Sequence, residues 1–283
     1  MEIFGVPTQA LFGQLLIGLV NGSFYALLSL GLAVISGLLN IINFTHGAQY
    51  MMGAFVSFLL LNKLGIGYWW SLLVVPLLVG ATGMVIERTM LSRLYKLDHL
   101  YGLLLTFGLA LIIQGLFRNE FGSSGQPYRI PPELAGGQNL GFMFLPNYRA
   151  WVIVASFFVC LATWYVIERT KLGAYLRAAI ENPQLVQAFG INVPRMITLT
   201  YGSGVGLAAL AGVMAAPIYQ VSPQMGADLI IVVFAVVVIG GMGSILGAIL
   251  TGFGLGVMEG LTKVFYPEAS NRRVDRRRRR PGT

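Results

Sequence analysis

The chain has 283 residues, of which 56% are apolar and only 11% are charged. A soluble domain of this size carries about a quarter charged residues, so the composition excludes an ordinary soluble globular protein. The formal net charge of +8 is concentrated in residues 271–283, which hold seven arginines and one aspartate. The remaining 12 basic and 10 acidic residues nearly cancel, which excludes the basic surface of a nucleic-acid-binding protein.

The apolar residues gather in runs long enough to cross a bilayer, and charged residues lie between the runs. The sequence therefore predicts an all-α fold, a polytopic transmembrane helical bundle of about eight spans. In chain order, the expected spans cover residues 10–37, 46–62, 68–86, 99–117, 150–167, 196–216, 228–246 and 248–265. The first run is long enough to tilt or break, and Asn21-Gly22-Ser23 marks its expected weak point.

The loops between the runs predict an orientation in the membrane. Segments 87–98 and 168–195 each contain several Lys and Arg residues, and short basic loops stay in the cytoplasm. The Gly-, Pro- and Asn-rich loop of about 118–149 then lies outside. Residues 1–270 form one multi-pass membrane domain in this reading.

Polar side chains within these runs mark candidate positions on a transport pathway. Asn43 and His46 lie where the second run begins, either as a network that satisfies backbone groups at the start of that helix or as pathway residues. Glu259 is an intramembrane carboxylate, and such groups are functional candidates. Its alternative role is an ion pair with Lys263 one helical turn later.

Glycines recur at four-residue spacing in the last third of the chain. Small residues at this spacing allow helices to pack closely in lipid, where little hydrophobic force drives them together. Ordinary packing is one interpretation, and a movable core around a pathway is the other. The positions concerned are Gly202, Gly206, Gly243, Gly247, Gly252, Gly256 and Gly260.

The loop 168–195 contains signals for a short helix outside the membrane. Asn182 is a suitable N-cap residue, Pro183 suits the first helical position and Gly190 suits the C-terminal end, so a helix is expected over 183–189. Leu185, Val186 and Phe189 are expected to share one face of this helix. This periodicity is compatible equally with a helix lying on the membrane and with one docked in a partner's groove.

No set of residues suggests an enzyme or a metal centre. Two histidines and the single Cys160 are too few for a His/Cys metal site. The phosphate-binding pattern GxxxxGK[ST] is absent, so the chain has no ATP-binding loop of this type. We therefore expect neither a bound metal nor a cofactor, and any energy for transport comes from a partner or an ion gradient.

Three stretches together resemble a known family. LRAAIENPQLVQAFGINVPRM at 176–196 resembles the cytoplasmic coupling loop of ABC-importer permeases, although Arg177 stands where many have Glu. NIINFTHGAQYMMGAF at 40–55 and the Gly-rich segment at 233–260 are similar to branched-chain amino acid permeases of the LivH type. The resemblance covers roughly residues 10–268.

The resemblance implies a permease subunit of an ABC importer in the bacterial inner membrane. An external binding protein would deliver the substrate, a second, LivM-like permease subunit would complete the pathway, and two cytoplasmic ATPases would bind the ATP. Leucine, isoleucine and valine are the leading substrates, with urea or short amides behind them. The residues implied in coupling to the ATPase are Arg177, Asn182, Pro183, Leu185, Val186, Phe189 and Gly190. The alternative is an ion-coupled secondary carrier for a small polar solute.

The Arg-rich tail, 271–283, conflicts with this interpretation. The eighth span ends outside, so seven arginines would face the wrong side, and the family normally closes with one more apolar helix. A lipid-binding tail is one explanation. We favour the other, a non-native end produced by a frame shift that replaced a ninth helix.

Overall fold

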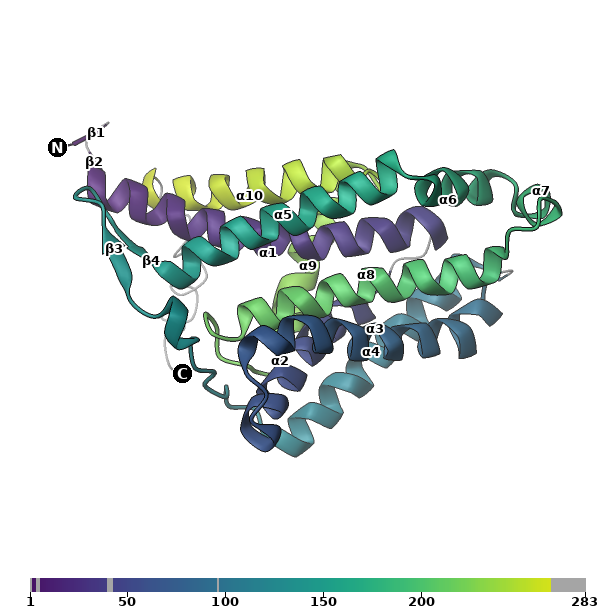
Figure 1. Cartoon of the computed structure of the whole chain (residues 1–283), viewed down its shortest axis with the longest axis horizontal. Coiled ribbons are helices and arrows are strands. Elements are labelled where there is room, and N and C mark those ends of the chain that lie inside the picture. The colour runs from purple at the N-terminus through teal and green to yellow at the C-terminus, as the bar shows by residue number, and fades with distance from the viewer. Residues whose placement is uncertain (1, 4–5, 40–42, 96, 266–283) are drawn as a thin grey trace, which may run out of the picture.

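The computed structural model describes residues 2–3, 6–39, 43–95 and 97–265, and they are predominantly helical (Figure 1). The helices are α1 (Thr8–Leu39), α2 (Thr45–Leu64), α3 (Tyr68–Thr89), α4 (His99–Phe121), α5 (Asn147–Arg169), α6 (Lys171–Glu181), α7 (Pro183–Ala188), α8 (Val193–Ala215), α9 (Met225–Gly240) and α10 (Ile245–Phe265). Each of the eight expected spans overlaps one of these helices. The helical class predicted from the sequence is therefore confirmed.

Six of the helices are long and apolar enough to cross a membrane: α1, α3, α4, α5, α8 and α10. With 16 residues, α9 is apolar but short, and α2 is not among the six. The chain is thus a multi-pass membrane protein, while the count of eight spans stays a prediction. The expectations for a replaced ninth helix and for the Arg-rich tail concern residues outside those that the structure describes.

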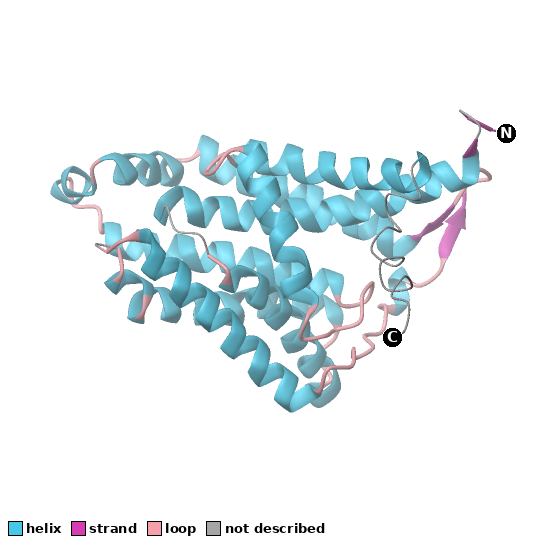
Figure 2. Cartoon of the chain, turned by 180° about the vertical axis from the view of Figure 1, so that it is seen from behind, coloured by secondary structure: helices cyan, strands magenta, loops and turns pink. Residues whose placement is uncertain are grey.

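The two ends of the bundle differ in structure. Helices α6 and α7 extend from one end, and the hairpin of β3 (Gly137–Asn139) with β4 (Phe144–Pro146) lies at the other, with the N-terminus (Figure 1). In the antiparallel hairpin, Gln138 pairs with Leu145. The short strands β1 (Glu2–Ile3) and β2 (Val6–Pro7) also pair antiparallel. Figure 2 shows that the strands are confined to this end, and the 3-10 turns η1 (Leu91–Arg93) and η2 (Pro132–Leu134) lie within loops.

Helix α1 is the central element of the bundle. It packs against α5, α8, α9 and α10, and its residues 24–35 are buried throughout. The weak point expected at Asn21-Gly22-Ser23 is wrong, because the helix is continuous there. The Ser23 hydroxyl donates to the Leu19 carbonyl of the preceding turn at 2.9 Å, and Gly22 lies against Phe253 of α10, so neighbouring contacts compensate for weak helix formers.

Glycines bring α10 into backbone contact with α1. A Cβ at Gly256 would lie 2.4 Å from the Gly18 carbonyl oxygen and from the Gly22 Cα, and Gly252 and Gly260 face α1 in the same way. On the other side, Gly202 and Gly206 of α8 meet α3. The predicted four-residue spacing thus places small residues on contact faces, where they permit close approach.

The glycine-rich segment at 240–247 forms the connection between two separate helices. Helix α9 ends at Gly240, the chain turns through Gly241 and Gly243 at φ of 94° and 83°, and α10 begins at Ile245. A positive φ favours glycine because it has no Cβ. Gly243 lies against Gly37 of α1, and Gly247 against the Gly240 carbonyl. The expected seventh span of 228–246 therefore ends earlier.

Helix α2 begins inside the bundle rather than at its edge. The His46 ring lies 3.0 Å from the Leu28 carbonyl in the middle of α1, and Gly47 meets Gly226 at the start of α9. Residues 45–51 are almost completely buried. The partial positive charge of a helix N-terminus is thus placed in the interior.

The glycine contacts predict which substitutions disrupt the bundle. Gly256→Ala should destabilise the protein by about 1–3 kcal/mol, because the added methyl group forces α1 and α10 apart. Gly254→Ala is the matched control, since a Cβ there meets nothing within 4 Å. Thermal unfolding in detergent measures both, and equal stabilities for the two variants would contradict this packing.

Candidate functional site

The first candidate residues, Asn43 and His46, lie in a buried polar cluster at the start of α2. The Asn43 side-chain oxygen accepts from the Thr45 backbone N–H at 3.1 Å, and its amide donates to the Tyr201 hydroxyl of α8 at 3.0 Å. The Phe44 N–H donates to the Thr106 hydroxyl of α4 at 3.3 Å. The bonds from the Phe44 and Thr45 N–H groups satisfy the backbone at the start of the helix, as the sequence interpretation of a network there expects. The pathway role of the two residues stays a prediction.

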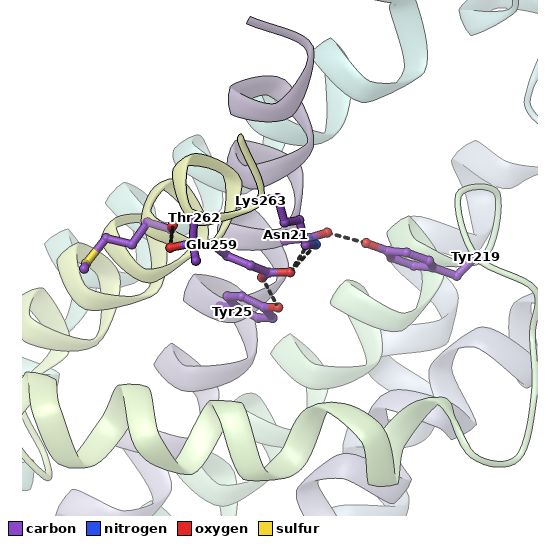
Figure 3. Close-up of polar contacts among 7 residues, drawn as sticks. Asn21, Tyr25, Tyr219, Glu259, Thr262 and Lys263 are labelled. Atoms are coloured by element: carbon purple, nitrogen blue, oxygen red, sulfur yellow. Dashed lines mark hydrogen bonds and ion pairs between the residues drawn. The ribbon is translucent and has the colours of Figure 1, made fainter. Parts of the chain in front are cut away.

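Glu259 is the acceptor at the centre of a second polar cluster, which joins α1, α10 and the loop 216–224 (Figure 3). Its carboxylate accepts from Tyr25 at 2.7 Å and from the Asn21 amide at 3.3 Å. Lys263 forms an ion pair with it at 2.6 Å. Tyr219 donates to the Asn21 side-chain oxygen at 2.6 Å. We call these five residues the Glu259 cluster.

The ion pair with Lys263 that the sequence suggested is present, but it is only part of the arrangement. Glu259 also fixes Asn21 and Tyr25, which come from a helix more than two hundred residues earlier in the chain. Sequence spacing revealed the contact one helical turn away and gave no sign of the contacts to α1. Glu259 is therefore a positioning residue for side chains on the inner face of α1.

A cavity of about 340 Å³ lies next to this cluster. Its polar lining consists of Asn21, Tyr25, Tyr219, Gln220, Ser222 and Asp228. The buried Tyr50 of α2 also lines it, so the cavity reaches from the loop 216–224 toward the first turns of α2. We call it the vestibule. Asn21 and Tyr25 thus belong both to the cluster and to the vestibule wall.

The loop 216–224 is held in place from two sides. Gln126 and Val221 exchange backbone hydrogen bonds of 2.8 and 2.9 Å, which ties this loop to the connection between α4 and α5, residues 122–146. Burial and the Glu259 carboxylate raise the pKa of Tyr219 to about 12, although Arg149 acts in the opposite direction. The Tyr219 phenol therefore stays protonated near neutral pH and keeps donating to Asn21.

The predicted helix at 183–189 is α7, at the opposite end of the molecule (Figure 1). The Asn182 side chain accepts from the Leu185 N–H at 3.0 Å, Pro183 is the first residue of the helix, and Gly190 follows it at φ of 82°. Phe189 is 77% exposed and Leu185 is 54% exposed. An apolar pair one turn apart is thus presented to the surroundings.

Two residues in this segment differ from the expected arrangement. Val186 is buried against Ala179 and Val193, so it fixes α7 to its neighbours and is not part of the exposed face. Arg177 forms an exposed ion pair with Glu168 at 3.3 Å and lies on α6, a helix that the sequence analysis did not predict. Exposed pairs of this kind contribute little to stability.

Glu87 is a buried carboxylate that the sequence analysis missed, because it was placed just beyond the third span. It lies on α3 and is 2% exposed. Thr198 of α8 donates to it at 2.6 Å, and Tyr95 donates to its other oxygen. Burial and this carboxylate raise the pKa of Tyr95 well above its usual value. The sequence signal was a carboxylate in the last turn of a predominantly apolar helix.

Comparison with known proteins identifies similar chains over most of the length. A family profile described as "Branched-chain amino acid transport system / permease component" matches residues 14–274. The high-affinity branched-chain amino acid transport system permease protein LivH of Escherichia coli strain K12 is 31% identical over 265 residues, covering 89% of this chain and 86% of the relative. No solved structure matches the chain.

Two further relatives extend this pattern. The permease protein BraD of Pseudomonas aeruginosa strain PAO1, described with the same transport system, is 31% identical over 261 residues, covering 87% of this chain and 84% of the relative. The permease protein LivM of Escherichia coli K12 is 29% identical over 267 residues, covering 85% of this chain and 62% of the relative. The similarity therefore includes two differently named permeases of one organism.

The Glu259 cluster predicts a stability pattern for substitutions of its ion pair. Glu259→Met should destabilise the protein by about 1–3 kcal/mol, because it leaves Lys263 without its carboxylate and Tyr25 without its acceptor. The double variant Glu259→Met/Lys263→Met should recover part of the loss, since no lone cation remains. Thermal unfolding of the three proteins measures this, and a double variant less stable than the single one would refute it.

Proposed function

Because the chain belongs to the family of branched-chain amino acid transport system permease components, we propose that it conducts branched-chain amino acids inward as a subunit of an ABC importer in a bacterial inner membrane. The family match over residues 14–274 is the observation that carries this proposal. A multi-pass bundle with a polar vestibule at one end and an exposed helix at the other is compatible with it.

The exposed pair of Leu185 and Phe189 supports a docking role for α7. An apolar pair one turn apart, on a capped helix outside the six membrane-crossing helices, suits insertion into a groove of a partner protein. The proposed partner is one of two cytoplasmic ATPases. Docking there would transmit nucleotide-driven movement to α8, which follows α7 directly, as a rigid-body displacement.

We propose a second permease subunit and an external binding protein as the remaining partners. The relation to both LivH and LivM supports a pair of related permease chains. ATP is bound by the ATPase partners in this assignment, because the sequence lacks the GxxxxGK[ST] pattern. An ion-coupled carrier is the weaker alternative, since the intramembrane Glu259 is already paired with Lys263.

Substitution of Phe189 tests the docking role. Phe189→Asp should weaken ATPase binding by ~2–4 kcal/mol, because it places a charge in an apolar groove. Leu97→Asp is the control: Leu97 is also an exposed apolar residue on a loop expected in the cytoplasm. Co-purification of the ATPase and ATP-dependent leucine uptake should fail only for Phe189→Asp. Wild-type recovery of the ATPase with that variant would exclude α7 as the docking element.

Cysteine labelling tests the orientation on which this assignment rests. In a Cys160→Ala background, a cysteine at Ser92 should be protected from an impermeant maleimide added to intact cells, and one at Ser123 should react. Both positions are exposed, so access depends on the side of the membrane. Labelling in the reverse pattern would place α7 outside and remove it from the reach of a cytoplasmic ATPase.

A further inference from the structure

The vestibule is lined by a carboxylate, that of Asp228, which is not part of the Glu259 cluster. Asp228 lies in the first turn of α9 and lines the cavity. Its side chain has neither a hydrogen bond nor an ion pair with any residue in the described part of the chain. By contrast, Glu259 is neutralised by Lys263. Asp228 is exposed, so it presents a carboxylate without a side-chain partner at the cavity wall.

Aromatic and apolar side chains complete the surface around this carboxylate. Tyr25 and Tyr219 line the vestibule with their hydroxyls engaged by Glu259 and Asn21. Phe24 packs edge-on against Tyr219, with ring centroids 5.7 Å apart. Aromatic rings attract cations, so they reinforce the carboxylate for a positively charged group. Met225 and Leu229 add an apolar wall from α9.

We propose that the vestibule is a transient binding site for the amino acid during transport, with the substrate's ammonium group paired to Asp228. The aliphatic side chain of the substrate lies against Phe24, Met225 and Leu229. The donors available for its carboxylate are the Gln220 amide, the Ser222 hydroxyl and the second N–H of the Asn21 amide, whose first N–H donates to Glu259. This assignment rests on the proposed function. It adds the location of the binding site and the orientation of the bound amino acid.

The size and chemistry of the cavity favour this occupant over other small solutes. About 340 Å³ is at the lower end of the range for small-molecule sites, roughly 300–1,000 Å³. A sugar or urea has no cation to pair with Asp228. An anion would be repelled by it. A zwitterion with an aliphatic side chain matches the carboxylate and the apolar wall together.

Substitutions of Asp228 in the assembled transporter test the site. In proteoliposomes that contain both permeases and the ATPases, with ATP inside and the binding protein outside, Asp228→Asn should lower leucine uptake at subsaturating leucine at least tenfold, while the subunits still co-purify. Asp228→Glu should recover part of the loss because it restores the charge. Glu120→Gln, which removes another exposed carboxylate, on α4, should transport as the wild type does.

Photolabelling locates the bound substrate independently of transport rate. Photo-leucine carries a diazirine that loses N₂ on irradiation and forms a carbene, which inserts into nearby bonds. Peptide mapping should find the label within residues 219–229 or on the peptide with Tyr25, and excess leucine should compete it away. Label elsewhere, or normal leucine uptake by Asp228→Asn, would overturn the site and leave the proposed function intact. A wild-type complex that does not transport leucine would overturn both.

Discussion

Direct contact between helix backbones is the interaction on which the rest of this bundle depends. Between α1 and α10, the Gly256 backbone lies so close to Gly18 and Gly22 that a side chain on it would overlap their atoms. In lipid, where little hydrophobic force drives helices together, such close packing supplies much of the attraction between them. The register of α10 on α1 follows from this contact, and that register brings Glu259 opposite Asn21 and Tyr25.

Lipid also offers no water as a hydrogen-bond partner, which explains why polar groups of the interior occur in clusters. Asn43 and Tyr201 satisfy each other next to the start of α2, and Glu87 accepts from Tyr95 and Thr198 near the C-terminal end of α3. A single buried polar group without a partner is costly, so pairing between polar groups of different helices is favoured. Each cluster therefore fixes the relative position of the helices that contribute to it.

The two ends of the molecule are specialised for different kinds of contact. At the end with α7, exposed Leu185 and Phe189 form a small apolar surface on a well-capped helix. At the other end, the loop 216–224 is tied down and encloses a cavity with polar and aromatic walls. The first suits a protein groove, and the second suits a small solute. Helices α1 and α8 run between them, which gives a physical connection between the two ends.

The sequence by itself determined the helical class, the position of each long helix within a few residues, the cap residues of α7 and the family. These features are local or compositional: runs of apolar residues, Asn182-Pro183, and three characteristic stretches. The ion pair of Glu259 with Lys263 was also predictable, because helical geometry brings residues one turn apart together. Only the tertiary structure decided that α2 begins inside the bundle, that Val186 faces inward and that Glu87 is buried. It also decided that Asn21, Tyr219 and Asp228 surround one cavity, because such contacts join residues far apart in the chain and depend on how closely the helices approach.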